Sequence, residues 1–420
     1  MFRLIYSIVI TITLPIAMLH LYLRGRKYPN YRRRRREHFG VFKAPAHEKS
    51  IWVHAVSVGE ALAAVPIIKR LQSEHPELPI IVTTTTPTGA ERIQALLGDS
   101  VRHLYSPYDL PWVVRSFIKK INPILTIIME TELWPNFIHY CKVSKIPMIV
   151  VNARLSVRSA NRYARLPIPT ERMLLHPLTL LACQSDGDAQ RFQLLGAKPE
   201  QVAVTGSVKF DLKLPERLNS VTAELFSQWD EQQFVWVAGS THAGEDEIVL
   251  ATQRKLLDRG IDAKLILVPR HPERFDSVAE LIEQRGFKFR RRSIEQCVAS
   301  ETEVFLCDSM GEMMFCYNKA NVCFVGGSLI ERGGHNPLEP AALAKPTLTG
   351  SHTFNFFDVY KNLINAQAAE VVNREQLEQR LIYYYENPSE ALKVGARGLK
   401  VVEANRGAIS KTMKLISNYL

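Results

Sequence analysis

The fold is decided by residues 124–152, which read ILTIIMETELWPNFIHYCKVSKIPMIVVN. The apolar runs at 124–130 and 148–152 are short, rich in Ile and Val, and apolar on both faces. Between them, residues 134–144 have the length and pattern of a helix. Strands of this kind are typical of a parallel sheet that helices cover on both sides. The stretch therefore predicts one strand–helix–strand unit of an α/β fold.

The same alternation fills the chain twice, on either side of a polar segment, 211–232, that is interpreted as a linker. Before it, the pattern predicts further strands over 51–58, 80–86, 101–105, 178–184 and 202–206, and helices over 60–73, 88–97, 111–120 and 187–195. After it, strands are predicted over 234–239, 264–268, 304–307, 322–326, 346–348 and 369–372, and helices over 245–259, 274–285, 311–318, 338–344, 374–387 and 389–404. We expect two doubly wound α/β domains, 31–215 and 216–420, after an amino-terminal segment 1–30. Ligands bind at the carboxyl ends of such strands, so the site is expected in a cleft between the domains.

Composition excludes several classes of protein. With 420 residues, 46% of them apolar and 23% charged, the chain is globular and too long for a single core. Its net charge is +11, but residues 1–40 hold nine Lys/Arg and one Glu, a local charge of +8 that leaves +3 for the other 380 residues. The body is therefore not a basic nucleic-acid-binding protein. Six scattered cysteines without a CxxC motif predict buried apolar residues in a reducing compartment, with neither disulfides nor zinc.

The amino end has the features of a membrane anchor. Leu4–Leu23 contains no Asp, Glu, Lys or Arg and, as a helix, would be ~30 Å long, which is the thickness of a bilayer core. The basic residues that follow it, Arg24 to Arg36, predict that the rest of the chain stays cytoplasmic. A helix that lies in the interface or packs into the protein is the alternative. A cleaved signal peptide fits poorly, because no small-x-small site follows and the arginines come after the apolar run.

Polar residues cluster where the predicted strands end. The first cluster, Ser57–Glu60, closes a strand and opens a helix. Gly59 permits a tight turn, and Glu60 lies in the first helical turn, where the helix dipole favours the ionised carboxylate that a general base needs. The alternative is an ordinary capping acid.

Two more clusters belong to the first domain. In Glu130–Pro135, the side chains of Glu130 and Glu132 point the same way in an extended chain, next to Trp134. Lys209, which ends the domain, would face the cleft. The alternatives are that Glu132 caps the next helix while Trp134 packs, and that Lys209 is a surface lysine.

The second domain has polar strand ends at Ser240, Arg270 and 308–312, and a glycine-rich run over 326–340. Four glycines let backbone N–H groups approach a ligand, Asn336 can cap a helix that starts at Pro337, and Glu339 would point at ribose hydroxyls. We interpret this run as an anion site suited to a phosphate, although many helices begin in a similar way. The chain has no GxxxxGK[ST], HExxH, GxSxG or GxGxxG signature at a strand–helix turn, and a metal is not indicated.

Together these motifs resemble the Kdo transferase family, which attaches 3-deoxy-D-manno-octulosonic acid (Kdo) to the lipid A precursor. The resemblance lies in Ser57–Glu60, Glu130–Pro135, Lys209–Asp211, Arg270–Pro272 and His335–Pro340, and it covers essentially the whole chain. It implies the GT-B fold, with two Rossmann-like domains that face a cleft. It also implies CMP-Kdo as donor, the acylated lipid IVA as acceptor, inversion without a metal or other cofactor, and a place in lipopolysaccharide synthesis at the inner membrane, with the catalytic domains on the cytoplasmic side.

The resemblance also implies roles for single residues. Glu60 would be the base that takes the proton of the acceptor hydroxyl, and Glu130 and Lys209 would support the transition state. The residues implied in CMP and CMP-Kdo binding are Ser240, Pro269, Arg270, His271, Met310, Gly311, Glu312, Gly327, Asn336, Pro337, Leu338 and Glu339. Those implied in acceptor binding are Ser57, Gly59 and Arg154.

Other functions remain open at this level. The arginines Arg154, Arg158, Arg162 and Arg165 either bind acceptor phosphates or form a solvated helix face. Another GT-B glycosyltransferase or a nucleotide-sugar epimerase has the same architecture, and a membrane-tethered lipid-binding module is a rival from a different class.

Overall fold

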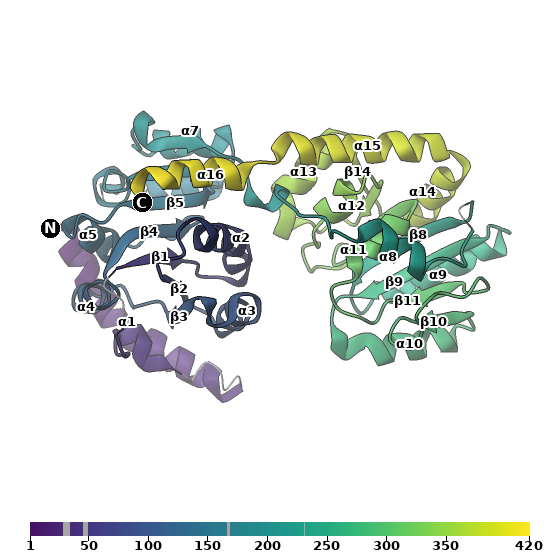
Figure 1. Ribbon diagram of the computed structural model, residues 1–420, viewed down its shortest axis with the longest axis horizontal. Helices are drawn as coiled ribbons and strands as arrows, with labels where there is room; N and C mark the ends of the chain where they lie inside the picture. Colours follow the sequence, from purple (N-terminus) through teal and green to yellow (C-terminus); the bar gives the residue numbers. More distant parts are fainter. Residues whose placement is uncertain (28–33, 45–48, 166–168, 231) are drawn as a thin grey trace. The chain divides into compact units, whose positions relative to one another are not determined.

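The computed structural model describes residues 1–27, 34–44, 49–165, 169–230 and 232–420, with side chains in the first helix described for residues 1–16 and 18. The chain forms two compact units, 1–211 together with 406–420, and 212–405. Each unit contains a seven-stranded sheet (Figure 1), and neighbouring strands are parallel throughout both sheets. The predicted pair of parallel α/β domains is thus confirmed.

The first unit has the strand order β3-β2-β1-β4-β5-β6-β7. Its strands are β1 Ser50–His54, β2 Ile80–Thr84, β3 Arg102–Tyr105, β4 Pro123–Met129, β5 Met148–Ala153, β6 Leu180–Cys183 and β7 Val202–Val204. Its helices are α1 Phe2–Lys27, α2 Val58–Glu74, α3 Pro87–Leu97, α4 Pro111–Ile121, α5 Pro135–Val143, α6 Val157–Ala164, α7 Asp186–Leu194 and α16 Ala408–Ile416.

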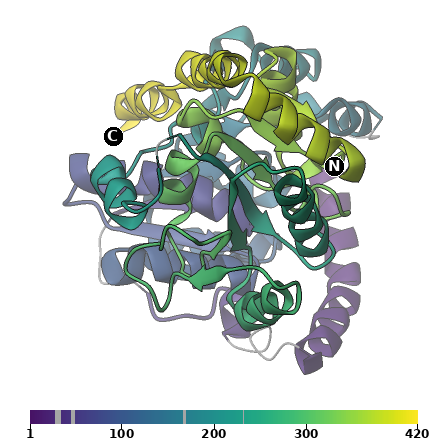
Figure 2. The same ribbon diagram turned by 90° about the vertical axis from the view of Figure 1, so that its right-hand side faces the viewer.

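The second unit repeats the plan with the order β10-β11-β9-β8-β12-β13-β14. Figure 2 shows the strands and helices of this unit in green to yellow. Its strands are β8 Phe234–Thr241, β9 Ala263–Pro269, β10 Phe289–Arg291, β11 Val304–Leu306, β12 Val322–Val325, β13 Thr347–Thr349 and β14 Ala369–Val371. Its helices are α8 Leu218–Leu225, α9 Asp246–Asp258, α10 Phe275–Gln284, α11 Met313–Lys319, α12 Leu338–Ala342, α13 Phe357–Asn365, α14 Arg374–Glu386 and α15 Pro388–Asn405.

Each sheet is buried on both faces, as the two-sided apolar strands predict. In β1, Ile51 and Val53 enter a cluster formed with α2, α3 and α16, whereas Trp52 enters the opposite cluster with α4, α5 and α7. Of the six cysteines, five are buried and Cys297 is half-buried. The cores thus hold the sheets rigid, so that the strand ends place side chains at fixed positions.

The domain boundaries differ from the predicted ones at both ends. The first unit ends at Asp211 rather than at 215, and it takes back the last fifteen residues, Arg406–Leu420, which were assigned to the second domain. The cause is Asp211, whose carboxylate accepts hydrogen bonds from the N–H groups of Gly407 (2.5 Å) and Ile409 (2.6 Å) at the start of α16. Met413 and Ile416 of α16 then fill the core of the first unit.

The polar segment 211–232 is more than a linker. It contains α8, and the second unit buries Leu225, the last residue of that helix, together with Phe226 and Trp229, which follow it. These three apolar residues lie too close together in the sequence to show the repeated three- and four-residue spacing of a helix. The sequence pattern therefore did not predict α8.

The amino-terminal stretch forms α1 and docks on the first unit. Arg3 Nη1 donates to Asn136 Oδ1 (3.0 Å), and the buried Ser7 hydroxyl lies 3.1 Å from the same oxygen. In the part of the chain that the structure describes, no helix combines the length and apolar character that a membrane crossing needs. Of the basic flank, the side chains of Arg24, Arg26, Lys27, Arg32 and Arg33 lie outside the described residues.

Arg34, which belongs to the same basic flank, has a structural role. Its guanidinium binds both carboxylate oxygens of Glu37 (2.7 and 2.9 Å) and the His103 carbonyl (2.6 Å). Glu37 in turn accepts the Tyr105 N–H (2.9 Å), so this arginine clamps the segment before β1 onto the edge strand β3.

Candidate functional site

In each sheet the strand order reverses beside the first strand of the unit. The first strand β1 lies between β2 and β4, and the corresponding β8 lies between β9 and β12. At such a switch point the connections leave in opposite directions, which opens a crevice at the carboxyl ends of the strands. Residues that follow β1 and β4, or β8 and β12, are therefore placed to contact a ligand.

Glu60 follows β1 and is 7% exposed in the first turn of α2. Its Oε2 accepts the Val56 N–H (2.8 Å), and its Oε1 accepts the Ser57 hydroxyl (2.9 Å). Burial, and after it repulsion from Glu132 and Glu130, raises the pKa of Glu60 to about 7, although the two hydrogen bonds act in the opposite direction. The helix dipole was predicted to keep this group ionised, but burial outweighs it, and Glu60 is about half protonated at neutral pH.

Glu130 and Glu132 follow β4 and belong to the same acidic cluster. Glu130 has a positive φ of 56°, which is uncommon for a residue with a side chain and bends the chain out of the strand. Glu132 accepts a hydrogen bond from the Trp134 indole (3.1 Å), and burial followed by repulsion from Glu130 raises its pKa. Because the charges of both acids act on Glu60, two of the three predicted clusters of the first domain, Ser57–Glu60 and Glu130–Pro135, are brought together.

The other predicted residues of this unit lie around the same edge. Lys209 sits in the 3₁₀ turn Val208–Phe210, which is fixed at the end of β5 because Val208 donates its N–H to Asn152 Oδ1 (3.2 Å). Arg154 directly follows β5, and its carbonyl accepts the Thr131 hydroxyl. Gly59 lies inside α2 rather than in a tight turn, and a Cβ there would meet nothing closer than Ser57 Oγ at 3.8 Å.

In the second unit, three histidines and an arginine gather at the strand ends. His242 and His335 follow β8 and β12; their rings stack with an interplanar angle of 8°, and their Nε2 atoms lie 2.8 Å apart. His271 packs edge-on against His242, with ring centroids 5.2 Å apart. The pKa of both His242 and His335 is lowered to about 4. Burial is the largest cause, and nearby positive charges that include Arg270 add to it. Both rings are therefore neutral at physiological pH and can donate or accept hydrogen bonds.

The glycine-rich run does not form the predicted phosphate site with the N–H groups of its first turn. Those of Gly327 (2.7 Å), Ser328 (3.0 Å) and Leu329 (3.0 Å) all donate to the fully buried carboxylate of Glu245. The His242 N–H (3.1 Å) is the fourth donor. An internal carboxylate thus takes the place expected for a ligand anion, and Gly327 serves to hold the loop.

The cap predicted further along this run is present in part, because Asn336 binds the start of the helix, but the helix begins at Leu338, with Pro337 rather than Asn336 as its N-cap residue. Asn336 Oδ1 accepts the Leu338 N–H (3.1 Å), and its amide donates to Glu339 Oε1 (3.3 Å). The helix that begins at Leu338 has five residues only. Burial raises the pKa of Glu339 while Arg270 opposes that shift, so Arg270, Glu339 and the histidines share one neighbourhood.

The turn 310–312 is held from the edge of the sheet. Glu312 accepts from Arg292 Nη2 (2.9 Å) and from the Ser309 hydroxyl, so its carboxylate is engaged within the protein. Met310 is exposed, and Gly311 has a φ of 89° with open space around it. Arg292 belongs to a stretch for which the sequence assigned no role; here it positions this turn.

Sequence reasoning missed several residues of these edges. His242 and Glu245 stand in polar runs next to Ser240, which was selected, but nothing in their spacing separates ligand contact from internal bonding. Asn152, with a φ of 56°, and His54 lie in apolar strands. The sequence feature that could have indicated these two residues is that each is a polar residue within an apolar run. Within the described ranges, no three or more His, Cys, Asp or Glu side chains are arranged to hold a metal ion.

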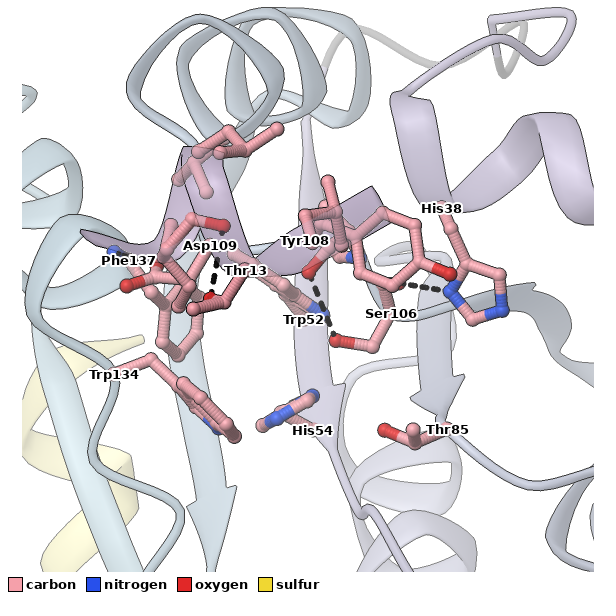
Figure 3. Close-up of a pocket in the computed structure, with 15 residues that line it drawn as sticks. Thr13, His38, Trp52, His54, Thr85, Ser106, Tyr108, Asp109, Trp134 and Phe137 are labelled. Carbon is pink, nitrogen blue, oxygen red and sulfur yellow. Dashed lines mark hydrogen bonds between the residues drawn. The ribbon is translucent and has the colours of Figure 1, made fainter. Parts of the chain in front are cut away.

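The first unit also holds an apolar cavity of about 250 Å³ beside the acidic cluster. Figure 3 shows His54 and Trp134 at this cavity, with Trp52, Tyr108 and Phe137 around it. One wall is formed by α1.

Comparison with known proteins identifies relatives along the whole chain. Residues 33–212 match the family model described as 3-deoxy-D-manno-octulosonic-acid transferase (kdotransferase). The chain is similar to the 3-deoxy-D-manno-octulosonic acid transferase of Haemophilus influenzae, with 40% identity over 100% of this chain and 99% of the relative. It is 35% identical to the enzyme of the same name from Bordetella pertussis, over 76% of this chain and 75% of the relative.

Solved structures with lower identity share the fold. The UDP-GlcNAc 2-epimerase from Neisseria meningitidis aligns with a TM-score of 0.57 at 14% identity, over 88% of this chain and all of the epimerase. MurG from Acinetobacter baumannii aligns with a TM-score of 0.56 at 10% identity, over 89% of this chain and all of MurG. These likenesses support an architecture of two parallel α/β domains, as in GT-B glycosyltransferases.

Proposed function

Because the chain belongs to the 3-deoxy-D-manno-octulosonic acid transferase family and is therefore a glycosyltransferase, we propose that it moves Kdo from CMP-Kdo to the lipid A precursor lipid IVA. In this reaction the bond between the anomeric carbon of Kdo and the CMP phosphate breaks, and its electron pair leaves with the phosphate. An acceptor hydroxyl attacks the opposite face of the same carbon and gives up its proton. The anomeric configuration is thereby inverted. Charged groups of the protein, without a metal, stabilise the charges that develop on the sugar and the phosphate.

The observation that carries this proposal is the state of Glu60. A general base works best when its pKa is close to the working pH, and burial raises the pKa of Glu60 to about 7. Its two described hydrogen bonds use one acceptor position on each oxygen, and a carboxylate has about four. Glu60 therefore keeps positions free to accept the proton of an acceptor hydroxyl.

The surroundings of Glu60 have the sign that the reaction needs. As the bond to CMP breaks, the sugar becomes cationic, and the negative charges of Glu130 and Glu132 stabilise it. Ser57, Gly59 and Arg154 lie beside this cluster, and the open space at Gly59 leaves room for the acceptor hydroxyl to approach. Lys209, on the turn that Asn152 holds, would balance the developing phosphate charge.

The donor nucleotide is assigned to the edge of the second unit. Arg270 supplies the positive charge for the phosphate, while the neutral His242 and His335 offer hydrogen bonds without a titration step near neutral pH. Asn336 and Glu339 offer polar groups to the ribose. Met310 and Gly311, which are open to solvent, would contact the base.

We place the enzyme on the cytoplasmic face of the inner membrane, with α1 lying in the interface. Ser7 is buried against α5, whereas Leu4, Ile8, Ile12 and Ile16 form an exposed apolar stripe with the four-residue spacing of one helix face. Such a helix binds a bilayer surface through its apolar side. Cosedimentation with vesicles of anionic lipid should be lost when Ile8 and Ile12 are both replaced by Asp.

The direct test is to incubate the purified protein with CMP-Kdo and lipid IVA and to weigh the product by mass spectrometry. One added Kdo residue per transfer supports the proposal. Glu60→Gln should lower the rate by about 100-fold or more, because a positioned base contributes that much. Glu91→Gln, on an exposed helix, is the matched control. An unchanged rate in Glu60→Gln would remove the base from its role.

The fold is similar to that of an epimerase, so the alternative function, a nucleotide-sugar epimerase, can be tested specifically. A CMP-sugar enzyme should gain thermal stability from CMP and none from UDP or UMP, because ligand binding to the native state raises the melting temperature. Equal protection by all three nucleotides, or interconversion of UDP-sugars without an acceptor, would favour the rival.

A further inference from the structure

The cavity of the first unit is apolar and closed on one side by the amino-terminal helix. Ile10 and Leu14 of α1 face Val114 and Phe137 of the domain across it. Its volume of about 250 Å³ exceeds that of an apolar cavity of about 150 Å³, which stays dry and binds benzene, so it has room for roughly ten carbon atoms. A space of this size and lining fits a short stretch of hydrocarbon chain.

One polar atom in the cavity wall lacks a partner. His54 is 2% exposed, and its Nε2 makes no hydrogen bond in the part of the chain that the structure describes. Its Nδ1 lies 2.9 Å from Thr83 Oγ1, which already accepts the Trp52 indole N–H (2.8 Å). Among the described residues, His54 Nδ1 is the acceptor available to the proton of the buried Thr83 hydroxyl, and with that proton directed to Nδ1 the neutral ring carries its own proton on Nε2. A buried donor of this kind needs an acceptor oxygen, because leaving it unpaired is costly.

The cavity adjoins the acidic cluster that contains Glu60. His54 ends β1, and two residues later the Val56 N–H binds Glu60. On the other side, the Trp134 ring lies at the cavity (Figure 3), and its indole N–H donates to Glu132. The cavity and the acidic cluster thus adjoin at two places, the end of β1 and Trp134.

We propose that this cavity binds one acyl chain of the acceptor, with the carbonyl or hydroxyl oxygen of that chain accepting a hydrogen bond from His54 Nε2. The proposal rests on the proposed function, since it assigns the acceptor's chain to a place next to the proposed base. It also explains why α1 has two different faces. The outer stripe contacts the bilayer, and the inner residues Ile10 and Leu14 form the wall that receives a chain drawn from it.

The kinetic experiment compares lipid IVA with its fully deacylated disaccharide bisphosphate as acceptors. Leu14→Trp fills the cavity from α1 and leaves every residue of the domain core unsubstituted, and Ile12→Trp adds the same side chain on the outer stripe. Each buried methylene is worth about fourfold in affinity. We therefore expect Leu14→Trp to raise the KM for lipid IVA at least tenfold, while the KM for CMP-Kdo and the rate with the deacylated acceptor stay unchanged. Equal effects of the two variants, or equal kcat/KM for both acceptors in the wild type, would overturn the proposal.

A binding experiment separates this site from the reaction. The probe is N-decanoyl glucosamine with bromine on the terminal carbon, which quenches tryptophan fluorescence at short range, and Trp52 and Trp134 line the cavity. We expect saturable quenching that the unbrominated compound reverses and that His54→Leu weakens more than His54→Gln. Quenching without Kdo transfer would refute the function and leave the acyl site standing. Kdo transfer without quenching would refute the acyl site alone.

Discussion

The dependence of the rate on pH tests the reasoning about Glu60 most directly. Burial, followed by repulsion from Glu132 and Glu130, raises the pKa of Glu60 to about 7. If its carboxylate is the base, kcat/KM should reach half of its plateau near pH 7 and fall about tenfold for each further unit, which gives about thirtyfold at pH 5.5. A carboxyl group with the ordinary pKa of 4.5 would leave the rate at pH 5.5 almost at its plateau.

Two variants should shift the acidic limb of the pH profile, in which kcat/KM falls below pH 7, in opposite directions. Ser57→Ala removes the hydroxyl that donates to Oε1, and that bond lowers the pKa of Glu60, so the limb should move to higher pH. Glu132→Gln removes a negative charge that raises the same pKa, so the limb should move to lower pH.

The assay is the initial rate of CMP release at subsaturating CMP-Kdo from pH 5 to 9, with Glu60→Gln as the blank. Melting temperatures at each pH verify that the protein stays folded. A wild-type limb near pH 4.5, or a limb that neither variant moves, would show that another group controls the rate and would refute the argument from burial.

Three further predictions concern stability. The pKa of Glu60 in the folded protein lies above its ordinary value, so the native state loses stability as pH rises from about 4.5 to 7. Glu60→Gln removes this loss and should be more stable than wild type by about 3 kcal/mol at pH 8, measured by urea unfolding. Below pH 4.5 the two proteins should be equally stable. Gly239→Ala places a Cβ 2.2 Å from the Tyr317 hydroxyl and should cost about 2 kcal/mol or more, whereas Gly59→Ala, with 3.8 Å of space, should melt like wild type. Glu245→Ala strips four N–H groups of their acceptor, two of them in fully buried hydrogen bonds, and should destabilise the protein by about 3–5 kcal/mol, which equal denaturant midpoints would contradict.

The strands of both sheets were predictable because their signal is local and strong. Every predicted apolar run contains a strand, with ends that differ by a few residues; for example, 124–130 became Pro123–Met129 and 322–326 became Val322–Val325. Two-sided burial favours apolar residues such as Ile and Val at most positions, and this preference is visible in the sequence without any knowledge of neighbouring elements.

The missed elements lie where that demand is absent. The edge strand β10 has one neighbour, and its residues Phe289–Arg291 are all half-buried, so arginines are tolerated there. Arg291 uses its position to bind Asp308 and Asp276, both at 2.7 Å. The place of α16 in the first unit depends on the Asp211 contacts across almost two hundred residues, which no local pattern reveals.

The candidate site was predictable to the level of strand ends and residue types. The sequence indicated that Glu60, Glu130, Arg270 and Asn336 follow strands at the ligand-binding edges, and the structure places them there. It did not indicate which N–H groups would already have a partner inside the protein, or how far burial would offset the helix dipole. Both depend on what packs above the strand ends, and that packing comes from distant parts of the chain.

Glu60 and Glu245 show how a structural acid differs from the acid that we propose as the base. Both are buried glutamates near the start of a helix that follows the first strand of a unit, and burial raises the pKa of both. Glu245 accepts two N–H groups on each oxygen, which fills its four acceptor positions, whereas the described hydrogen bonds of Glu60 fill two. A carboxylate whose four acceptor positions are all occupied holds a loop in place and cannot accept a hydrogen bond from a substrate. Among its described hydrogen bonds, the half-filled Glu60 keeps an acceptor position on each oxygen, which is what its proposed role as the base for an incoming hydroxyl requires.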